Sequence, residues 1–406
     1  MSLTDAFGNR VTCDSAQAVA AADRAIDAHL HAWPGTLEAL DEALALAPTF
    51  ALAHATRALV LATWGRRAPA QEALALARAS WASLLPREQS HVELVQLLVG
   101  GQVPAAQEHL LGHARQWPTD ALACATAVGA YGSFAFSGRL DHDGARLAFI
   151  ESLLPHYPRD WRWLLANRGW AHIEAGHVAE GLAMAQQALA ARPANAHNAH
   201  IVLHGWFELD RPDEGLAFLD AWLPGYPPHG LLWGHLHWHG AMGELQQGRD
   251  AAAKGRLLGP ILDYLPHGTP FMMLADLASL LWRLGLRGQS GLPWAAAQGL
   301  AKEHFERGSN VFGELHLSML AAAAGDDVGL VACAQRLRAI AESGHPAAPV
   351  ALQWVDALRA LLRDDRVAAA QALARCCDEL PRLGGSHAQR TVVEITAVAG
   401  RLPSVA

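Results

Sequence analysis

The chain has 406 residues, of which 51% are hydrophobic and 17% are charged. This composition excludes an intrinsically disordered chain, which has too little apolar surface to bury against the entropy cost of folding. The formal net charge is −8, and no segment gathers lysine and arginine. A duplex-binding protein needs a basic face, so we expect no nucleic-acid partner.

The sequence shows no targeting segment. No basic stretch followed by an apolar core stands at the beginning, and no apolar run reaches the ~18 residues that a membrane span requires. The five cysteines are scattered and odd in number, which suits reduced thiols better than a disulfide framework. We therefore expect a cytoplasmic protein with no membrane partner.

Helical periodicity extends over the whole chain, and alanine-rich runs favour helices. Proline turns at Pro118, Pro158 and Pro193 precede apolar segments, with Asp120, Asp160 and Asn195 as expected N-caps. In chain order, helices are expected at 14–31, 35–47, 50–64, 69–83, 86–99, 103–117, 119–132, 142–153, 160–175, 178–191, 195–208, 212–223, 229–246, 249–262, 270–285, 292–306, 310–324, 327–342, 347–361, 365–379 and 385–400.

Two consecutive units in the middle of the chain set a repeat period. Glu180 and Glu214 occupy equivalent positions, as do Pro193 and Pro227, and both pairs are 34 residues apart (214 − 180 and 227 − 193). That period belongs to the tetratricopeptide repeat, a pair of antiparallel helices. No linker divides the chain. We predict one all-α solenoid, an α-α superhelix of tetratricopeptide-like helix pairs, over 1–406, with the most regular repeats at about 160–227.

The first helix of each pair in such a solenoid lines the concave side. The inner helices are then 160–175, 195–208, 229–246, 270–285 and 310–324. Their side chains are the first place to look for function.

Histidines are concentrated on two of these inner helices. His200 and His204 are four residues apart, as are His235 and His239, so each pair shares one helix face. With a period of 34, His204 is equivalent to Trp238, about one turn from the second histidine pair. A histidine on an apolar helix can also be a core residue whose ring is satisfied.

Further polar residues follow on the next two inner helices. Asp276, Ser279 and Arg283 form a stripe at i, i+3 and i+7 on an otherwise apolar helix, and His316 lies in the middle of the next one. A buried ion pair between Asp276 and Arg283 is an alternative explanation. Burying so many titratable groups is costly without a use. We predict a shared internal pocket lined by His204, His235, His239, Asp276, Arg283, His316 and Trp238.

The spacing of the two histidine pairs could chelate zinc or iron. No His-Glu-x-x-His run and no cysteine pair at ligand spacing accompanies them, so we expect no metal and no cofactor. A metal site of His200, His204, His235 and His239 remains the alternative. We find no serine triad and no glycine-rich phosphate loop.

One further candidate lies in the N-terminal third. Arg87 and His91 share a face at the start of a helix that opens with Pro86. They are candidate ligand-binding residues, and the alternative is that Arg87 ties two repeats together.

Short matching stretches in order along the chain make the sequence similar to the tetratricopeptide repeat protein 38 family. They lie at 5–12, 48–54, 86–91, 117–123, around His204, at 211–215, 235–239, 276–284 and 312–316. Leu236 replaces an asparagine of the family pattern, and Gly313 and Glu314 stand where the pattern has Asn-Asp. The resemblance implies the helical-repeat fold and does not assign a reaction.

Three functions are compatible with these observations. The first is a concave pocket that binds a small molecule or short peptide and acts on it. The second is a scaffold that binds a partner protein along the concave groove. The third is an enzyme that uses histidine acid–base or metal-assisted chemistry. Histidines and tryptophans on apolar helices favour a closed pocket over an open, charged groove.

Overall fold

The computed structural model describes residues 3–158 and 161–403. In this part of the chain nearly all regular structure is helical, which confirms the all-α prediction. The first third contains β1 (Leu3–Thr4), β2 (Arg10–Val11), α1 (Ala16–Leu30), α2 (Thr36–Leu46), α3 (Ala51–Thr63), α4 (Arg67–Ala79), α5 (Pro86–Val99), α6 (Val103–Gln116) and α7 (Ala121–Val128).

The remaining helices follow in the same up-and-down manner. The middle third contains α8 (His142–Leu153), α9 (Arg162–Glu174), α10 (Val178–Ala191), α11 (Ala196–Glu208), α12 (Pro212–Trp222), α13 (Trp233–Gln246), α14 (Asp250–Arg256) and α15 (Leu262–Tyr264). The last third contains α16 (Pro270–Leu286), α17 (Trp294–His304), α18 (Val311–Ala323), α19 (Asp327–Glu342), α20 (Ala348–Leu362), α21 (Arg366–Cys377) and α22 (His387–Ala399). Single turns are η1 (Trp81–Ser83), η2 (Ala135–Ser137), η3 (Leu154–His156), η4 (Leu223–Gly225), η5 (Leu257–Ile261) and η6 (Leu380–Leu383).

Two predicted N-caps are confirmed. The side chain of Asp120 accepts a hydrogen bond from the backbone N–H of Ala123, and Asn195 caps α11 in the same way through Asn198. Asp160, the third predicted cap, lies outside the described residues. A buried cap of this kind satisfies a backbone donor that the first helical turn leaves unpaired.

One predicted helix, 249–262, is divided in the structure. It begins as α14, passes through the π-helical turn η5 and ends as the single turn α15. Pro260 is the cause, because proline has no N–H to donate and its ring crowds the preceding turn. Gly259, just before it, has non-helical backbone angles.

Consecutive helices pack as antiparallel pairs, for example α1 with α2, α9 with α10 and α20 with α21. The α9–α10 crossing is close because glycines meet there. A Cβ atom added to Gly181 would lie only 2.5 Å from the carbonyl oxygen of Gly169. Small residues at such crossings let the helix backbones approach each other.

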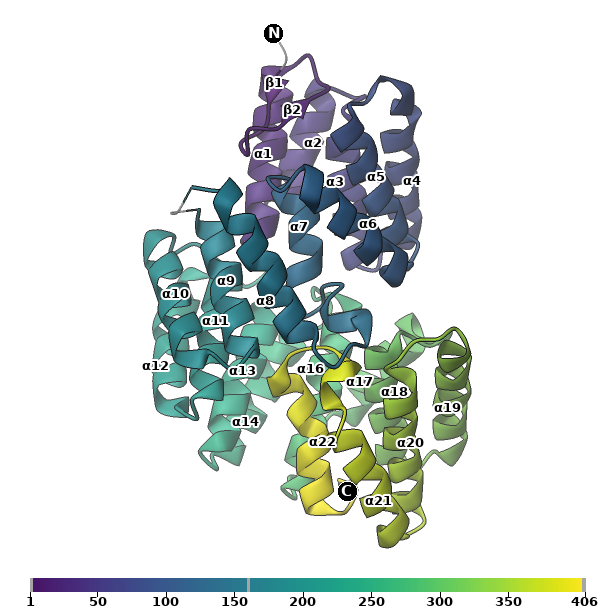
Figure 1. Ribbon diagram of the computed structural model, residues 1–406. Helices are drawn as coiled ribbons and strands as arrows, with labels where there is room; N and C mark the ends of the chain where they lie inside the picture. The colour runs from purple at the N-terminus through teal and green to yellow at the C-terminus, as the bar shows by residue number, and fades with distance from the viewer. Residues whose placement is uncertain (1–2, 159–160, 404–406) are drawn as a thin grey trace.

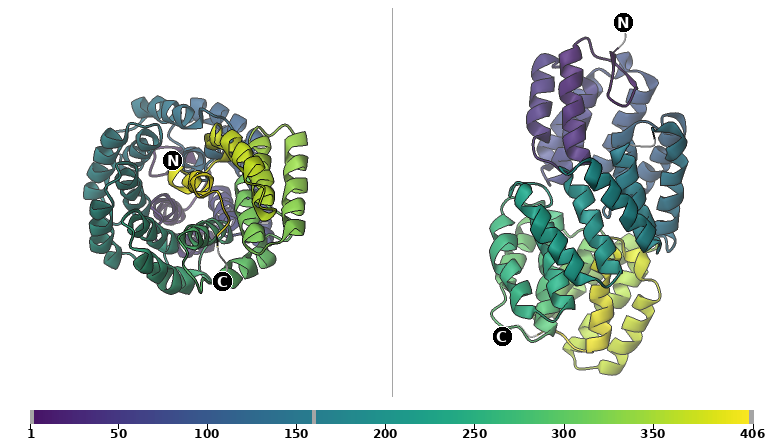
Figure 2. Two further views of the ribbon diagram at one scale, coloured as in Figure 1. Left: turned by 90° about the horizontal axis from the view of Figure 1, so that it is seen from below. Right: turned by 90° about the vertical axis from the view of Figure 1, so that its left-hand side faces the viewer.

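The helix pairs wind into a superhelix whose inner wall includes α9, α11, α13, α16 and α18 as neighbours. Figure 2 shows this wall as a ring, with the yellow C-terminal segment lying inside it. That segment is α22, which packs against α16, α11 and α21. The sequence predicts 385–400 only as a further helix, and the structure adds that it occupies the concave side.

Two inner helices hold α22 by hydrogen bonds. From α16, Arg283 donates to the carbonyl oxygen of Ala388 at 3.0 Å, and the indole N–H of Trp282 donates to Thr396 Oγ1 at 2.8 Å. From α11, Glu208 lies 2.8 Å from Nδ1 of His387. Where α11 and α16 line the concave groove of the superhelix, the groove is therefore occupied by α22 of the same chain.

The loop around η2 also meets the C-terminal part of the chain. Arg382 donates to the carbonyl oxygen of Gly138 at 3.0 Å, and Gln389 of α22 donates to the hydroxyl of Tyr131 at 2.9 Å. The ring of Tyr131 lies 5.3 Å from that of Phe271 on α16. These contacts join the two halves of the superhelix around α22.

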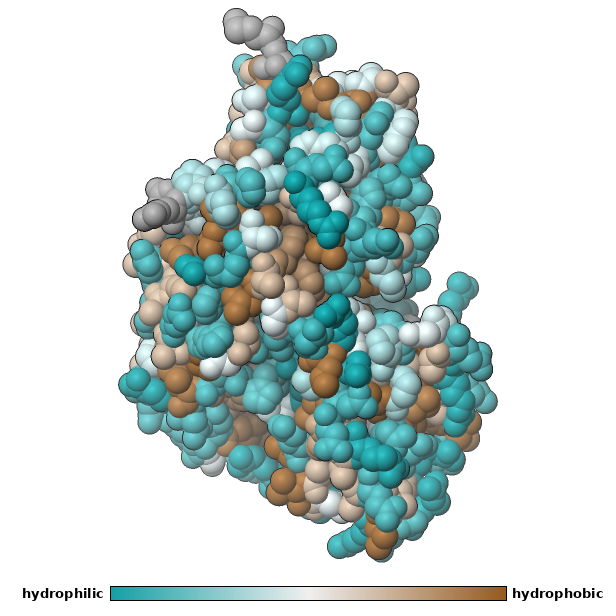
Figure 3. All heavy atoms as spheres, in the orientation of Figure 1, coloured by the Kyte–Doolittle hydropathy of each residue, from teal (hydrophilic) through white to brown (hydrophobic). Residues whose placement is uncertain are grey.

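The surface is mixed in character. Figure 3 shows hydrophilic residues over most of one face, with hydrophobic residues in small separate patches. The large hydrophobic side chains that are exposed come from different elements: Leu46, Leu76, Leu140, Leu258, Val328, Val367 and Val398. Within residues 3–158 and 161–403, none of the helices has the length and apolar character that crossing a membrane requires.

Candidate metal centre

Four histidines meet on the inner wall between α11 and α13. His200 and His204 belong to α11, and His235 and His239 belong to α13. One ring nitrogen from each lies within 4.8 Å of the others, and all four residues are buried. The i, i+4 spacing places each pair on one face of its helix, and the two faces are turned toward each other. We call these residues the four-histidine cluster.

The pairing of residues between α11 and α13 differs from the predicted one, which placed equivalent positions 34 residues apart. His200 lies beside His235 and His204 beside His239, with ring centroids 4.7 and 4.5 Å apart, so the equivalent positions differ by 35 residues (235 − 200) rather than 34. The reason is one extra residue in a loop. From Pro193 to His200 is a step of 7, whereas from Pro227 to His235 is a step of 8.

Protons cannot satisfy all the nitrogen contacts in the cluster. Nε2 of His200 lies 2.9 Å from Nε2 of His204 and 3.0 Å from Nε2 of His235. A neutral imidazole has one N–H and one lone pair, so Nε2 of His200 cannot form linear hydrogen bonds to both neighbours with its single proton. Nε2 of His239 is buried with no hydrogen-bond partner in the described part of the chain. Hydrogen bonds between the rings therefore cannot pair all the nitrogens of the cluster.

Burial keeps three of the four imidazoles neutral. It lowers the pKa of His200, His204 and His239 well below the usual value of 6.5, and the neighbouring rings lower it further. The cause is the cost of placing a cation in a poorly solvated interior. Neutral imidazoles keep the lone pairs that a metal ion requires.

Two indoles enclose the cluster. Trp170 of α9 lies with its ring centroid 4.7 Å from that of His204, and Trp238 stacks on His235 at 5.4 Å with an interplanar angle of 6°. Trp238 is fixed by its N–H, which donates to Ser279 Oγ at 3.0 Å. These large rings limit the access of water to the histidines.

A carboxylate orients one of the rings. Asp276 of α16 lies 2.9 Å from Nδ1 of His235, and its carboxyl group is completely buried. Burial raises the pKa of Asp276, although His235 opposes the shift. When ionised, Asp276 accepts the Nδ1–H of His235 and turns the Nε2 lone pair toward the cluster. Metal-binding histidines are commonly held by such a carboxylate.

A second carboxylate approaches from the opposite side. Oε1 of Glu174, at the end of α9, lies 3.6 Å from Nδ1 of His204. Its other oxygen accepts a hydrogen bond from the backbone N–H of His387 at 3.0 Å. Burial raises the pKa of Glu174 to about 7, although Arg390 and Arg146 oppose the shift.

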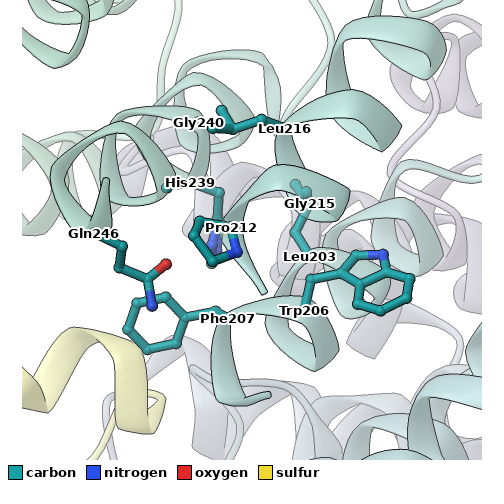
Figure 4. A pocket seen from close by; sticks show the side chains of 10 residues that line it. Leu203, Trp206, Phe207, Pro212, Gly215, Leu216, His239, Gly240 and Gln246 are labelled. Atoms are coloured by element: carbon teal, nitrogen blue, oxygen red, sulfur yellow. The ribbon is translucent and has the colours of Figure 1, made fainter. Parts of the chain in front are cut away.

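A small hollow borders the cluster on its outer side. It has a volume of about 20 Å³ and is lined by Leu203, Trp206, Phe207, Pro212, Gly215, Leu216, His239, Gly240, Gly243 and Gln246. Figure 4 shows the side chains of His239, Gln246 and Phe207 around it. This volume suffices for one water molecule or ion.

The other predicted pocket residues have different partners. Asp276 and Arg283 do not pair with each other, because Asp276 faces His235 and Arg283 holds α22. His316 directs Nδ1 to the carbonyl oxygen of Phe312 on its own helix at 2.8 Å and is not one of the clustered histidines. The structure therefore groups His204, His235, His239 and Asp276, and it leaves His316 apart.

Arg87 and His91 belong to a separate buried network. Arg87 donates to Asp120 at 2.6 Å and to the carbonyl oxygen of Arg10 at 3.2 Å, while Nδ1 of His91 lies 3.0 Å from the same carboxylate. Burial alone would raise the pKa of Asp120, but His91, His113 and Arg87 hold it well below its usual value. The network joins β2, α5 and α7, in agreement with the alternative that Arg87 ties repeats together.

Sequence reasoning missed Glu174 and α22 as parts of this region. A glutamate in the last turn of a helix has no pattern that distinguishes it from a solvated residue. The position of α22 depends on contacts between residues more than 100 apart, such as Trp282 with Thr396. The sequence does contain a signal for the cluster. His235 follows His200 by 35 residues, and His239 follows His204 by the same 35 residues.

No family model matches the chain. The resemblance to the tetratricopeptide repeat protein 38 family therefore stays a prediction. Among solved structures, the chain is similar to the crystal structure of yeast Tom70, with a TM-score of 0.42 and 12% sequence identity. The match covers 94% of this chain and 87% of that chain.

Proposed function

We propose that this helical-repeat protein binds one divalent transition-metal ion, with Zn²⁺ as the best-fitting ion, through His200, His204, His235 and His239. The observation that carries the proposal is the convergence of four buried imidazoles from two neighbouring helices within 4.8 Å. It takes up the alternative left open by the sequence in place of the expected absence of a metal.

The geometry of the cluster is close to what zinc needs. Zn–N bonds of about 2.0–2.1 Å in a tetrahedron separate the ligand atoms by roughly 3.3 Å. The nitrogen contacts begin at 2.9 Å, and the widest is 4.8 Å. Small rotations of the imidazole rings would bring all four to that spacing. Imidazole also suits Cu²⁺ and Ni²⁺, whereas a tetrahedral arrangement favours zinc.

A bound ion would resolve the unfavourable features of the cluster. It would bind Nε2 of His200 and of its two neighbours, whose contacts a single proton on His200 cannot satisfy. It would also balance Asp276, whose only ion pair within the described residues is with His235. Of the four histidines only His239 lines the neighbouring hollow, which has room for a water molecule beside the proposed site.

The test is direct titration of chelator-treated protein with Zn²⁺ by calorimetry, together with elemental analysis of the protein as purified. We expect one ion per chain. Co²⁺ should give the visible absorption of a tetrahedral site. Variants His204→Gln and His239→Gln should abolish both signals, and His237→Gln is the matched control, because His237 lies on the same helix beside Trp233 and outside the cluster.

Stability measured without metal separates this proposal from a purely structural polar core. If the histidines only pack, the glutamine variants should lower the melting temperature with or without metal. If they bind an ion, the variants should lose mainly the stabilisation that Zn²⁺ adds. Absence of Zn²⁺ binding by folded wild-type protein would exclude the proposal.

A second candidate function is the binding of a partner protein's helix on the concave side. The observation that favours it is that this side already accepts a helix, because α22 lies there against α16 and α11. A labelled peptide of residues 385–401 should then bind a variant chain that stops before Gly384, and not the full chain. Equal binding to both would exclude this candidate.

A further inference from the structure

The four-histidine cluster and the inner helix α22 share structural supports. The cluster lies between α9, which ends at Glu174, and α16, which carries Asp276. Both of these helices also contact α22. On α16, Arg283 follows Asp276 by two turns and donates to Thr391 of α22 at 2.8 Å.

Glu174 connects the cluster and α22 directly. Its side chain is completely buried, with Oε1 3.6 Å from Nδ1 of His204 and Oε2 3.0 Å from the backbone nitrogen of His387. His387 is the first residue of α22, and its N–H is one of those that a helix leaves unpaired. A carboxylate there also interacts favourably with the positive end of the helix dipole.

The position of one proton on His204 decides how Glu174 is held. A metal ion on Nε2 requires the proton on Nδ1, where it faces Oε1 of Glu174. The carboxylate then lies between two donors. The backbone N–H of His387 on α22 donates to it at 3.0 Å, and Nδ1 of His204 on α11 lies 3.6 Å away, close enough for a small side-chain shift to make a hydrogen bond. Without an ion, His204 can place its proton on Nε2 and donate to His200, 2.9 Å away. Its Nδ1 lone pair then faces Oε1, and the two repel each other while Glu174 is ionised.

We infer that ion binding by the four-histidine cluster controls the docking of α22 on the concave side, with Glu174 transmitting the state of His204 to the first turn of α22. The inference rests on the proposed metal site. The ion-bound protein is the closed form, with α22 firmly seated. The ion-free protein releases the first turn of α22 more often and exposes the inner face to a partner.

The test is hydrogen–deuterium exchange of the full chain, after chelator treatment and after addition of Zn²⁺. Amides of α22 should exchange about tenfold more slowly with Zn²⁺, which corresponds to about 1.4 kcal/mol. Amides of α19 are the reference, since that helix packs on α18 and α20 and monitors general stabilisation.

The variant Glu174→Gln tests whether Glu174 connects His204 to the first turn of α22. Its amide keeps the shape of the side chain but cannot accept from His204 and His387 at once, because one end is a donor. Measured at a Zn²⁺ concentration that saturates the variant, it should lose the effect of Zn²⁺ on α22. Glu151→Gln is the matched control, because Glu151 also contacts a histidine, His172 at 3.3 Å, but not α22.

The outcomes distinguish the two proposals. Zn²⁺ binding with slower exchange in α22, lost only in Glu174→Gln, supports the inference. Zn²⁺ binding with equal changes in α19 and α22 overturns the inference and leaves the metal site standing. If Zn²⁺ slows exchange in α22 of Glu174→Gln as much as in the wild type, the role of Glu174 is overturned. Failure of the wild-type chain to bind Zn²⁺ overturns both.

Discussion

At the scale of single residues, carboxylates determine what the buried imidazoles can do. Asp276 orients His235, Glu174 faces His204, and Glu208 faces His387. The contacts to Asp276 and Glu208, at 2.9 and 2.8 Å, favour a proton on Nδ1 of His235 and His387, whereas Glu174 lies 3.6 Å from Nδ1 of His204. The chemistry of the cluster therefore depends on residues that are not themselves metal ligands.

Removing the charge of Asp276 should weaken metal binding. In Asp276→Asn the side chain can still accept the Nδ1–H of His235, but it no longer adds negative charge behind the ligand. We expect the dissociation constant for Zn²⁺ to rise by about 10–100-fold, as is typical for such outer partners. Competition with a chromophoric chelator measures the dissociation constant for Zn²⁺. The exposed Asp263 provides the control substitution Asp263→Asn, which should change nothing.

The contact between His387 and Glu208 should depend on pH. The hydrogen bond to Glu208 raises the pKa of His387 above 6.5, while burial and Arg390 oppose the shift and Glu174 assists it. A histidine whose pKa is raised on folding stabilises the fold fully below its unfolded pKa, and this stabilisation is lost as the pH rises through the folded value. His387 is half-exposed, so the effect is small.

Thermal unfolding of the wild type and of His387→Asn over a pH series checks this expectation. The difference between the two melting temperatures should be largest below pH 6.5 and should shrink at higher pH. Glu174 and Arg390 are present in both proteins, so the difference reports mainly on His387. A difference that grows with pH would contradict the assignment.

At the scale of helices, local pattern and long-range packing differ in how well a sequence reveals them. All the predicted helices have counterparts in the described residues, because 3.6-residue periodicity and caps such as Asn195 are local properties. The cluster was only partly predicted. One additional residue after Pro227 shifts the register by a position, and the family period of 34 hides that shift.

The close crossing of α9 and α10 gives a prediction at this scale. In Gly181→Ala the new Cβ would lie 2.5 Å from the carbonyl oxygen of Gly169, which is backbone and cannot rotate away. We expect a loss of about 1–3 kcal/mol in the free energy of unfolding. Chemical denaturation measures it.

The control for that variant is Gly299→Ala. Gly299 is an exposed residue within α17, and a Cβ atom there would meet no other atom within 4 Å. This change should stabilise the protein by about 0.4–1 kcal/mol, because alanine restricts the unfolded chain. Similar effects at both positions would show that the α9–α10 crossing is not tight.

At the scale of the whole molecule, the interior of the superhelix could not be deduced from the sequence. Residues 385–400 have the same amphipathic pattern as the outer helices, so their pattern does not distinguish the inside from the outside. Only contacts between distant positions, such as Gln389 with Tyr131, place α22 in the ring. Apolar neighbours on several sides, rather than a motif, hold it there.

Metal binding should stabilise the folded molecule as a whole. A ligand that binds only the native state adds about 2.7 kcal/mol when its free concentration is a hundred times its dissociation constant. We expect Zn²⁺ to raise the melting temperature of the chain and a chelator to reverse the rise. Unchanged melting in both conditions would contradict a metal site in the native fold.

The position of α22 also constrains the order in which the molecule is built. During translation, α9, α11, α13 and α16 leave the ribosome before α22 exists, since α22 follows them in the chain. Domains begin to fold while synthesis continues. The newly made ring is therefore open on its inner side, and Glu174 and Trp282 lack their partners on α22, His387 and Thr396. The proposed ion can therefore reach the inner wall in that interval, before α22 enters the ring.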